Sequence, residues 1–66
     1  MSAVEEAIAA AGSQSKLAEA LGVKQPVIAH WKRKGWTPAA RAAQIESLFG
    51  IPATSLLRPD LREIVQ

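Results

Sequence analysis

Basic side chains are concentrated in one stretch of the sequence. Between Glu19 and Glu46 the chain has no acidic residue, and this interval holds Lys24, Lys32, Arg33, Lys34 and Arg41. The net charge of the whole chain is only +2, so the positive potential is carried mainly by this part of the surface. Such a cluster of cations suits a polyanion, for example nucleic acid. A solvated basic face without a partner would give the same pattern, so charge alone leaves both interpretations open.

Few residues are available for other kinds of chemistry. The chain has no cysteine and a single histidine, His30, which excludes disulfides, thiolate metal sites and thiol nucleophiles and is typical of a reduced cytoplasmic protein. Its 66 residues predict a single domain over 1–66, with little room for an enzyme-sized cleft. No basic leader and no apolar run of about 18 residues is present. We therefore expect a cytoplasmic protein that is not an enzyme and has no cofactor, metal, small-molecule ligand or membrane contact.

Apolar residues that recur three and four apart, between Gly and Pro breaks, predict four helices and no strand. The expected ranges are about 3–11, 14–21, 24–34 and 38–49, followed by one weaker turn over 54–57. Ser2 with Glu5 fits a capping box for the first helix, and Ser13 is placed to cap the second. Glycine follows each helix as a stop signal, at Gly12, Gly22, Gly35 and Gly50. Residues 58–66 are expected to form a flexible or dimer-forming tail.

The second and third helices have the spacing of a helix-turn-helix, from about Gln14 to Trp31. Two helices that cross over a short turn need a small side chain at the crossing, which Ala18 supplies, and a residue that tolerates positive φ, which Gly22 supplies. Val23 then fills the turn from inside. The periodicity of the third helix points Val27, Ile28 and Trp31 inward and leaves Gln25, Ala29, His30 and Arg33 on the outside. Trp36, in the following loop, is expected to cover the core or to contact a second copy of the chain.

These residues resemble the phage Cro and repressor-like helix-turn-helix proteins, most closely the Cro-like regulators of temperate phages and prophages. The resemblance rests on the run from Ser13 to Val23, on Gln25-Pro26-Val27-Ile28, and on Trp31-Lys32, with a weaker match at Arg58-Pro59-Asp60. It implies a small all-α bundle of four to five helices of the lambda-repressor-like class. Lys24 departs from the pattern, because relatives usually carry Ser, Thr or Asp as the cap of the recognition helix.

By this resemblance the third helix enters the major groove and the second lies across the DNA backbone. Base contacts are then expected from Lys24, Gln25, Pro26, Ala29, His30 and Arg33. Phosphate contacts are expected from Gln14, Ser15, Lys16, Lys32 and Lys34. The residue types fit these roles, because a glutamine can bond bidentately to adenine, a lysine can reach guanine, and small apolar surfaces suit the thymine methyl. Plain solvent exposure remains the alternative for Gln25, Ala29 and His30.

One recognition helix reads only a few base pairs, so two copies are expected to act together on a palindromic site. The apolar residues after the fourth helix exceed what so small a core can bury. The dimer contact is therefore expected from Phe49, Leu56, Leu57 and Leu61. The alternative is that these residues all fold back on the first and fourth helices of a monomer.

The sequence thus predicts a regulator that binds double-stranded DNA sequence-specifically, as a Cro-like repressor that occupies a pseudo-palindromic operator as a dimer. A helical protein-interaction module with the same fold is the alternative. The two differ in the outer face of the third helix, where an interaction module would expose leucines or aromatic residues. An enzyme is remote, because no spacing of the single histidine with other residues supports a catalytic arrangement.

Overall fold

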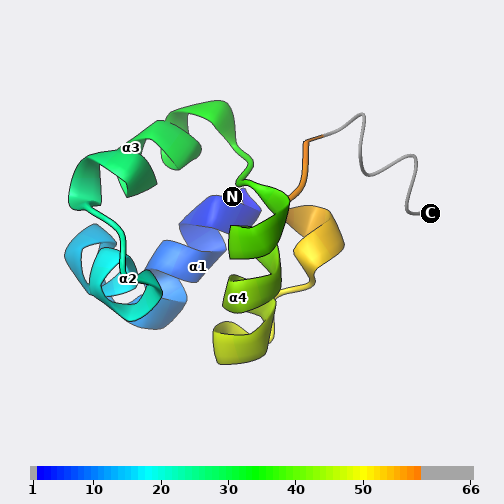
Figure 1. The fold of residues 1–66 in the computed structure, drawn as a ribbon, viewed down its shortest axis with the longest axis horizontal. Helices are drawn as coiled ribbons and strands as arrows, with labels where there is room; N and C mark the ends of the chain where they lie inside the picture. Colours follow the sequence, from blue (N-terminus) through cyan, green and yellow to red (C-terminus); the bar gives the residue numbers. More distant parts are fainter. Residues whose placement is uncertain (1, 59–66) are drawn as a thin grey trace.

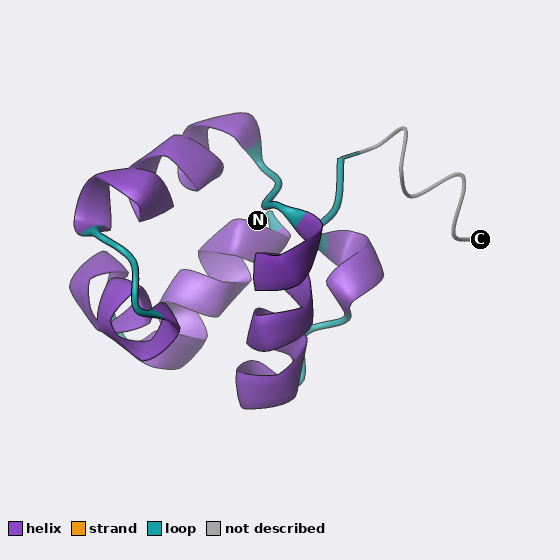
Figure 2. Cartoon of the chain, in the orientation of Figure 1, coloured by secondary structure: helices purple, strands orange, loops and turns teal. Residues whose placement is uncertain are grey.

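The computed structural model describes residues 2–58 as a bundle of α-helices with one short 3₁₀ turn. The elements follow in the order α1 (Ala3–Ala11), α2 (Gln14–Leu21), α3 (Gln25–Lys34), α4 (Ala39–Phe49) and η1 (Ala53–Ser55). α1 crosses the middle of the molecule, with α2 and α3 on one side and α4 and η1 on the other (Figure 1). Figure 2 shows only helices and loops over the described residues, so the predicted all-α bundle with a helix-turn-helix is confirmed.

Serine caps begin the first two helices, as predicted. The Ser2 hydroxyl oxygen accepts a hydrogen bond from the backbone N–H of Glu5 at 3.2 Å, and the Ser13 hydroxyl accepts one from the N–H of Lys16 at 3.1 Å. Each bond satisfies a donor that has no partner within the helix. α2 ends at Gly22, whose φ of +73° lies in the left-handed region that favours glycine. These ends fix the short turn through which α2 leads into α3.

α4 begins one residue later than predicted. The helix begins at Ala39 with Pro38 as its N-cap, and no side chain caps it. Thr37 is instead buried, at 1 % exposure. Its N–H donates to the Leu56 carbonyl at 2.7 Å, and its hydroxyl donates to the Pro38 carbonyl at 3.2 Å. Thr37 therefore fastens the loop between α3 and α4 to the segment that follows η1.

The described residues share an apolar core to which every helix contributes. Its buried members are Ala3, Val4, Ala7, Leu17, Ala18, Leu21, Ile28, Trp31, Ala42, Ile45, Leu56 and Leu57. Trp31 is only 5 % exposed, which confirms its predicted place in the core. The prediction for Val27 is wrong, because this side chain is 37 % exposed. An α-helix turns about 100° per residue, and the narrow inner stripe of α3 is already filled by Ile28 and Trp31.

The predicted turn after Pro52 is present as η1, which begins one residue earlier than expected. A carboxylate oxygen of Glu46 in α4 accepts the N–H of Ala53 at 3.0 Å and so holds the start of this turn. Residues 59–66, which include Leu61 and most of the predicted tail, lie outside the described residues. In the described part of the chain, no helix has the length and apolar character needed to cross a membrane.

Candidate nucleic-acid interface

α3 has two chemically different faces. Ile28 and Trp31 fill its inner face, at 0 % and 5 % exposure. The opposite face is a stripe with the spacing of one helical side: Pro26, Ala29, His30 and Arg33. Ala29 is half-buried and the other three are exposed. Residues three, four and seven apart lie on the same side of a helix, so this stripe points away from the core.

The N-terminal end of α3 adds two more polar side chains to this surface. Lys24 is the N-cap and makes no side-chain capping bond, while Gln25 opens the helix and is exposed. An ammonium group has no acceptor, so Lys24 cannot cap the free N–H groups of the first turn. All six residues predicted to contact bases thus lie on one helix and its cap.

Three residues at the start of α2 are predicted to contact phosphate, and their side chains differ in exposure and direction. Ser15 is exposed and Gln14 is half-buried. The Lys16 side chain folds back over the turn between α1 and α2. It lies so close to Gly12 that a Cβ added to this glycine would be 3.1 Å from Cδ and 3.6 Å from Nζ of Lys16. Its apolar stem covers the turn, and its charge lies by the C-terminal end of α1, where a cation is favourable.

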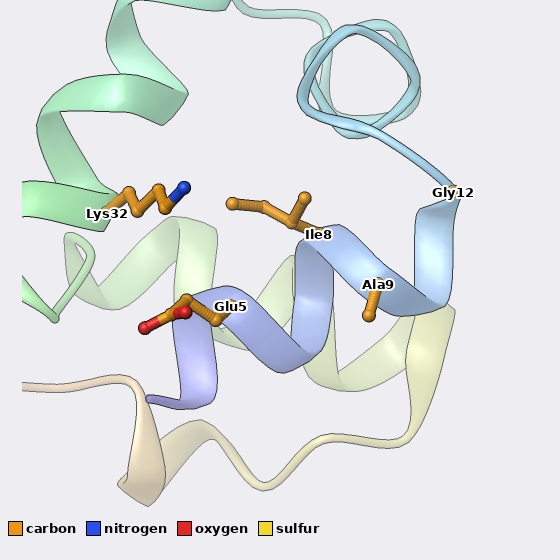
Figure 3. Close-up of a pocket in the computed structure, with 5 residues that line it drawn as sticks. All are labelled: Glu5, Ile8, Ala9, Gly12 and Lys32. Carbon is orange, nitrogen blue, oxygen red and sulfur yellow. The ribbon is translucent and has the colours of Figure 1, made fainter. Parts of the chain in front are cut away.

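Lys32 leaves α3 on a different side from the stripe. It lines an open pocket of about 250 Å³ whose other walls belong to α1 and its cap: Glu5, Ile8, Ala9 and Gly12. Figure 3 shows the Lys32 side chain extending from α3 toward Ile8, with Glu5 on the same helix as Ile8. The structure therefore does not bring Lys32 together with the predicted base contacts.

Lys34, by contrast, lies against an aromatic ring. Its Nζ is 5.1 Å from the centre of the Trp36 ring, and the guanidinium carbon of Arg58 is 5.7 Å from the same ring. Trp36 is half-buried, so both of its sequence interpretations, a cover for the core and a contact with a second copy, stay predictions. Its contact with two cations was not indicated by the sequence, because Arg58 is distant along the chain.

Arg41 has a structural role that sequence reasoning missed. It was counted within the basic stretch, but its Nη1 donates to the main-chain carbonyl of Leu21 at 2.9 Å and to Oε1 of Gln44 at 2.8 Å. Gln44 Nε2 also lies 3.4 Å from the same carbonyl. This carbonyl ends α2 and has no partner within the helix. The spacing of Arg41 and Gln44 in α4 could have predicted their pairing, but nothing local points to Leu21.

The residues predicted for a dimer contact need correction. Leu56 is 0 % exposed and Leu57 is 9 % exposed, because both fold back into the core of their own chain. They offer almost no surface to a second copy. Phe49 is half-buried at the edge of the core, and its neighbour Leu48 is 52 % exposed.

Comparison with known proteins agrees with this architecture. The chain matches the family model described as "Bacterial toxin YdaS" over residues 4–65. Among solved structures it is similar to the Cro protein from the putative prophage element Xfaso 1 of Xylella fastidiosa strain Ann-1, with 40 % sequence identity and a TM-score of 0.82, over 92 % of this chain and 95 % of that chain. No curated protein matches it. The chain therefore belongs to the YdaS family of Cro-like helix-turn-helix proteins.

Proposed function

We propose that this protein is a transcription regulator that binds double-stranded DNA sequence-specifically, as a Cro-like repressor. The observation that carries the proposal is the outer stripe of α3 with its N-terminal end, where polar and cationic groups stand opposite the buried Ile28 and Trp31. A side chain can read a base edge only if the core leaves it free. This surface meets that requirement.

The chemistry of the surface supports major-groove contact. Gln25 carries the amide that bonds bidentately to an adenine edge, and Lys24 and Arg33 carry donors suited to guanine. Pro26 and Ala29 add small apolar surface of the kind that packs against a thymine methyl. Val27, at 37 % exposure, is the exposed large apolar residue of α3, so the helix lacks the leucines or aromatic residues that a protein-binding groove would present.

Phosphate contacts would hold the recognition helix in register. The candidates are Gln14 and Ser15 at the start of α2, and Lys34 at the end of α3. Lys16 would have to leave the turn at Gly12 to reach DNA, and Lys32 would have to leave the pocket beside Glu5. We therefore rank these two lysines below Lys34 as phosphate contacts.

We further propose that two copies occupy a pseudo-palindromic operator. A symmetric pair would place its recognition helices about 34 Å apart on one face of the duplex. Phe49 keeps part of its surface, and Leu48 beside it is 52 % exposed. In the described part of the chain, this end of α4 brings an exposed leucine and a partly exposed phenylalanine together in the sequence, so we place the dimer contact there.

Selection from a random pool of duplex DNA, followed by sequencing, tests the proposal. We expect a single enriched motif with two related half-sites about one helical turn apart. Binding to that motif should weaken steeply with salt, with a slope of log K against log [salt] near −3 to −5 for about 3–5 phosphate contacts per copy. A pool without an enriched motif, together with affinity that does not respond to salt, would exclude DNA binding.

The matched family is described as a bacterial toxin. Expression of the chain in bacteria, with growth as the readout, therefore gives a second test. If DNA occupation accounts for any arrest of growth, Arg33→Met should relieve the arrest while the protein stays folded and abundant. Glu19→Gln is a suitable control, because Glu19 is exposed on α2 and lies outside the proposed base contacts. Arrest that persists in the Arg33 variant would show that toxicity has another cause.

A further inference from the structure

Trp36 gathers two cations that are far apart in the sequence. Lys34 is the last residue of α3, and Arg58 follows η1, yet their charged groups lie 5.1 Å and 5.7 Å from the centre of one ring. Both distances are within the range at which the face of an indole attracts a cation. One ring therefore contacts two cations that come from different segments of the chain.

The backbone fixes this arrangement from both sides. The N–H of Thr37, directly after Trp36, donates to the carbonyl of Leu56 at 2.7 Å. Leu56 is fully buried and Leu57 nearly so, so the segment that leads to Arg58 is anchored in the core. The position of Arg58 beside Trp36 thus depends on packed residues and on a main-chain hydrogen bond.

The cluster also continues the candidate interface. Lys34 belongs to the same helix as the outer stripe, and Lys34 and Arg58 are both exposed. Two neighbouring cations attract a polyanion more strongly than either does alone. A ring that holds both side chains also reduces the conformational entropy that they would lose on binding.

We infer that Lys34, Trp36 and Arg58 form a second phosphate-binding patch, which holds the DNA backbone beside the base pairs that α3 reads. This inference rests on the proposed function and adds Arg58, which lies outside the helix-turn-helix, to the DNA contacts. Trp36 acts as a positioning residue for the two cations. The ligand is the sugar–phosphate backbone, so the patch should contribute affinity without sequence preference.

The salt dependence of binding tests the role of Arg58. We expect Arg58→Gln to make the slope of log K against log [salt] shallower by about 0.9 for each bound copy, which corresponds to one phosphate contact. Arg58→Lys keeps the charge and should restore the slope. The loss of affinity in Arg58→Gln should be the same on the selected motif and on a scrambled duplex. Circular dichroism melting should give equal midpoints for the three proteins, which shows that the comparison is between folded chains.

Duplex length provides an independent readout of the same contact. Shortening the DNA on both sides of the selected motif removes flanking phosphates without touching the bases. The original chain should bind the shortened duplex more weakly than the long one. Arg58→Gln should bind the two duplexes almost equally, because the contact of Arg58 with the flanking phosphate is already absent. Equal losses for the two proteins would overturn the inference.

Tryptophan emission reports on the ring itself. Trp31 is buried and Trp36 is half-buried, so DNA that reaches the patch should change the emission of Trp36. The change should disappear in Trp36→Phe. If Trp36→Phe shows the same change, the signal comes from Trp31, and the patch does not meet DNA.

These outcomes separate the inference from the proposed function. If the original chain shows no salt-dependent binding to any duplex, the proposed function fails and the inference fails with it. If the chain binds its motif but Arg58→Gln leaves both the slope and the response to duplex length unchanged, only the inference is overturned.

Discussion

The guanidinium group of Arg41 in α4 donates a 2.9 Å hydrogen bond to the main-chain carbonyl of Leu21, the last residue of α2. The bond joins the fourth helix to the point at which the helix-turn-helix turns. Because Gln44 supports the same guanidinium at 2.8 Å, the contact is held in one geometry. The end of α2, from which the turn leads into α3, is therefore held by a residue outside the motif.

Replacement of Arg41 by methionine should destabilise the fold. It removes a charged hydrogen bond and leaves the Leu21 carbonyl without its strongest donor, a loss of about 1.5–3 kcal/mol. For a domain of this size, each kcal/mol lowers the melting temperature by about 4–8 °C. Arg33→Met is the matched control, because Arg33 is exposed on α3. It should leave the melting temperature unchanged while it weakens DNA binding, and equal midpoints for both variants would contradict the role of Arg41.

Replacement of Gln25 by alanine should relax the choice of sequence. We expect a loss of about 1–3 kcal/mol on the selected motif and almost none on scrambled DNA, since the amide would read a base edge. Lys34→Ala should instead weaken both duplexes alike, because a phosphate contact carries no sequence information. Fluorescence anisotropy on the two duplexes measures both effects. If Gln25→Ala reduced the affinity for the selected motif and for scrambled DNA equally, the Gln25 side chain would have no role in base recognition.

Replacement of Gly22 by valine should lower the melting temperature. The φ of +73° at Gly22 is costly for any residue with a Cβ, by about 1 kcal/mol or more. Beyond its two neighbours in the chain, no residue comes within 4 Å of a Cβ built at this position, so the cost comes from the local backbone. Gly22→Ala should cost less than Gly22→Val, because a β-branched side chain is the most restricted at positive φ, and Gly22→Asn should cost least, because asparagine tolerates this region better. Thermal melts of the three variants give the order, and an unchanged midpoint for valine would exclude strain at this turn.

Two copies of the chain should occupy one selected duplex. Leu48→Gln should weaken this pairing, because it replaces a side chain that is 52 % exposed at the proposed contact with a polar one. Sedimentation with and without the duplex measures the number of copies bound. Val27→Gln is the control for loss of exposed apolar surface elsewhere, since Val27 is 37 % exposed on α3. A complex with one copy per duplex at saturation would contradict the dimer, as would a single half-site that binds as tightly as the whole motif.

The starts of α1 and α2 and the end of α2 were predictable because their signals are local. Ser2 and Ser13 cap the helices that they precede, and the break at Gly22 needs only the backbone preference of glycine. The outer face of α3 also followed from helical spacing once the inner residues were identified. The exception was Val27, where the pattern assigned more of the helix circumference to the core than the neighbouring helices cover.

The parts that sequence reasoning missed depend on contacts between distant segments. Arg41 meets Leu21, Thr37 meets Leu56, and Arg58 meets Trp36, and in none of these pairs does either residue signal the other. The same limit explains the dimer prediction, because the burial of Leu56 depends on how η1 folds against α4. The neighbours of Lys32 were also not predictable, because its place beside Glu5 and Ile8 depends on where α1 packs against α3.

The hydrogen bond between Thr37 and Leu56 joins the residues on either side of the segment that contains α4 and η1. Leu56 is fully buried in the core, but a single connecting segment, residues 50–52, joins the end of α4 to the turn that carries it. The burial of Leu56 therefore depends on the covalent continuity of this segment. A cut there would free the piece that completes the core, and the helix-turn-helix would lose its support although every one of its own peptide bonds stayed intact.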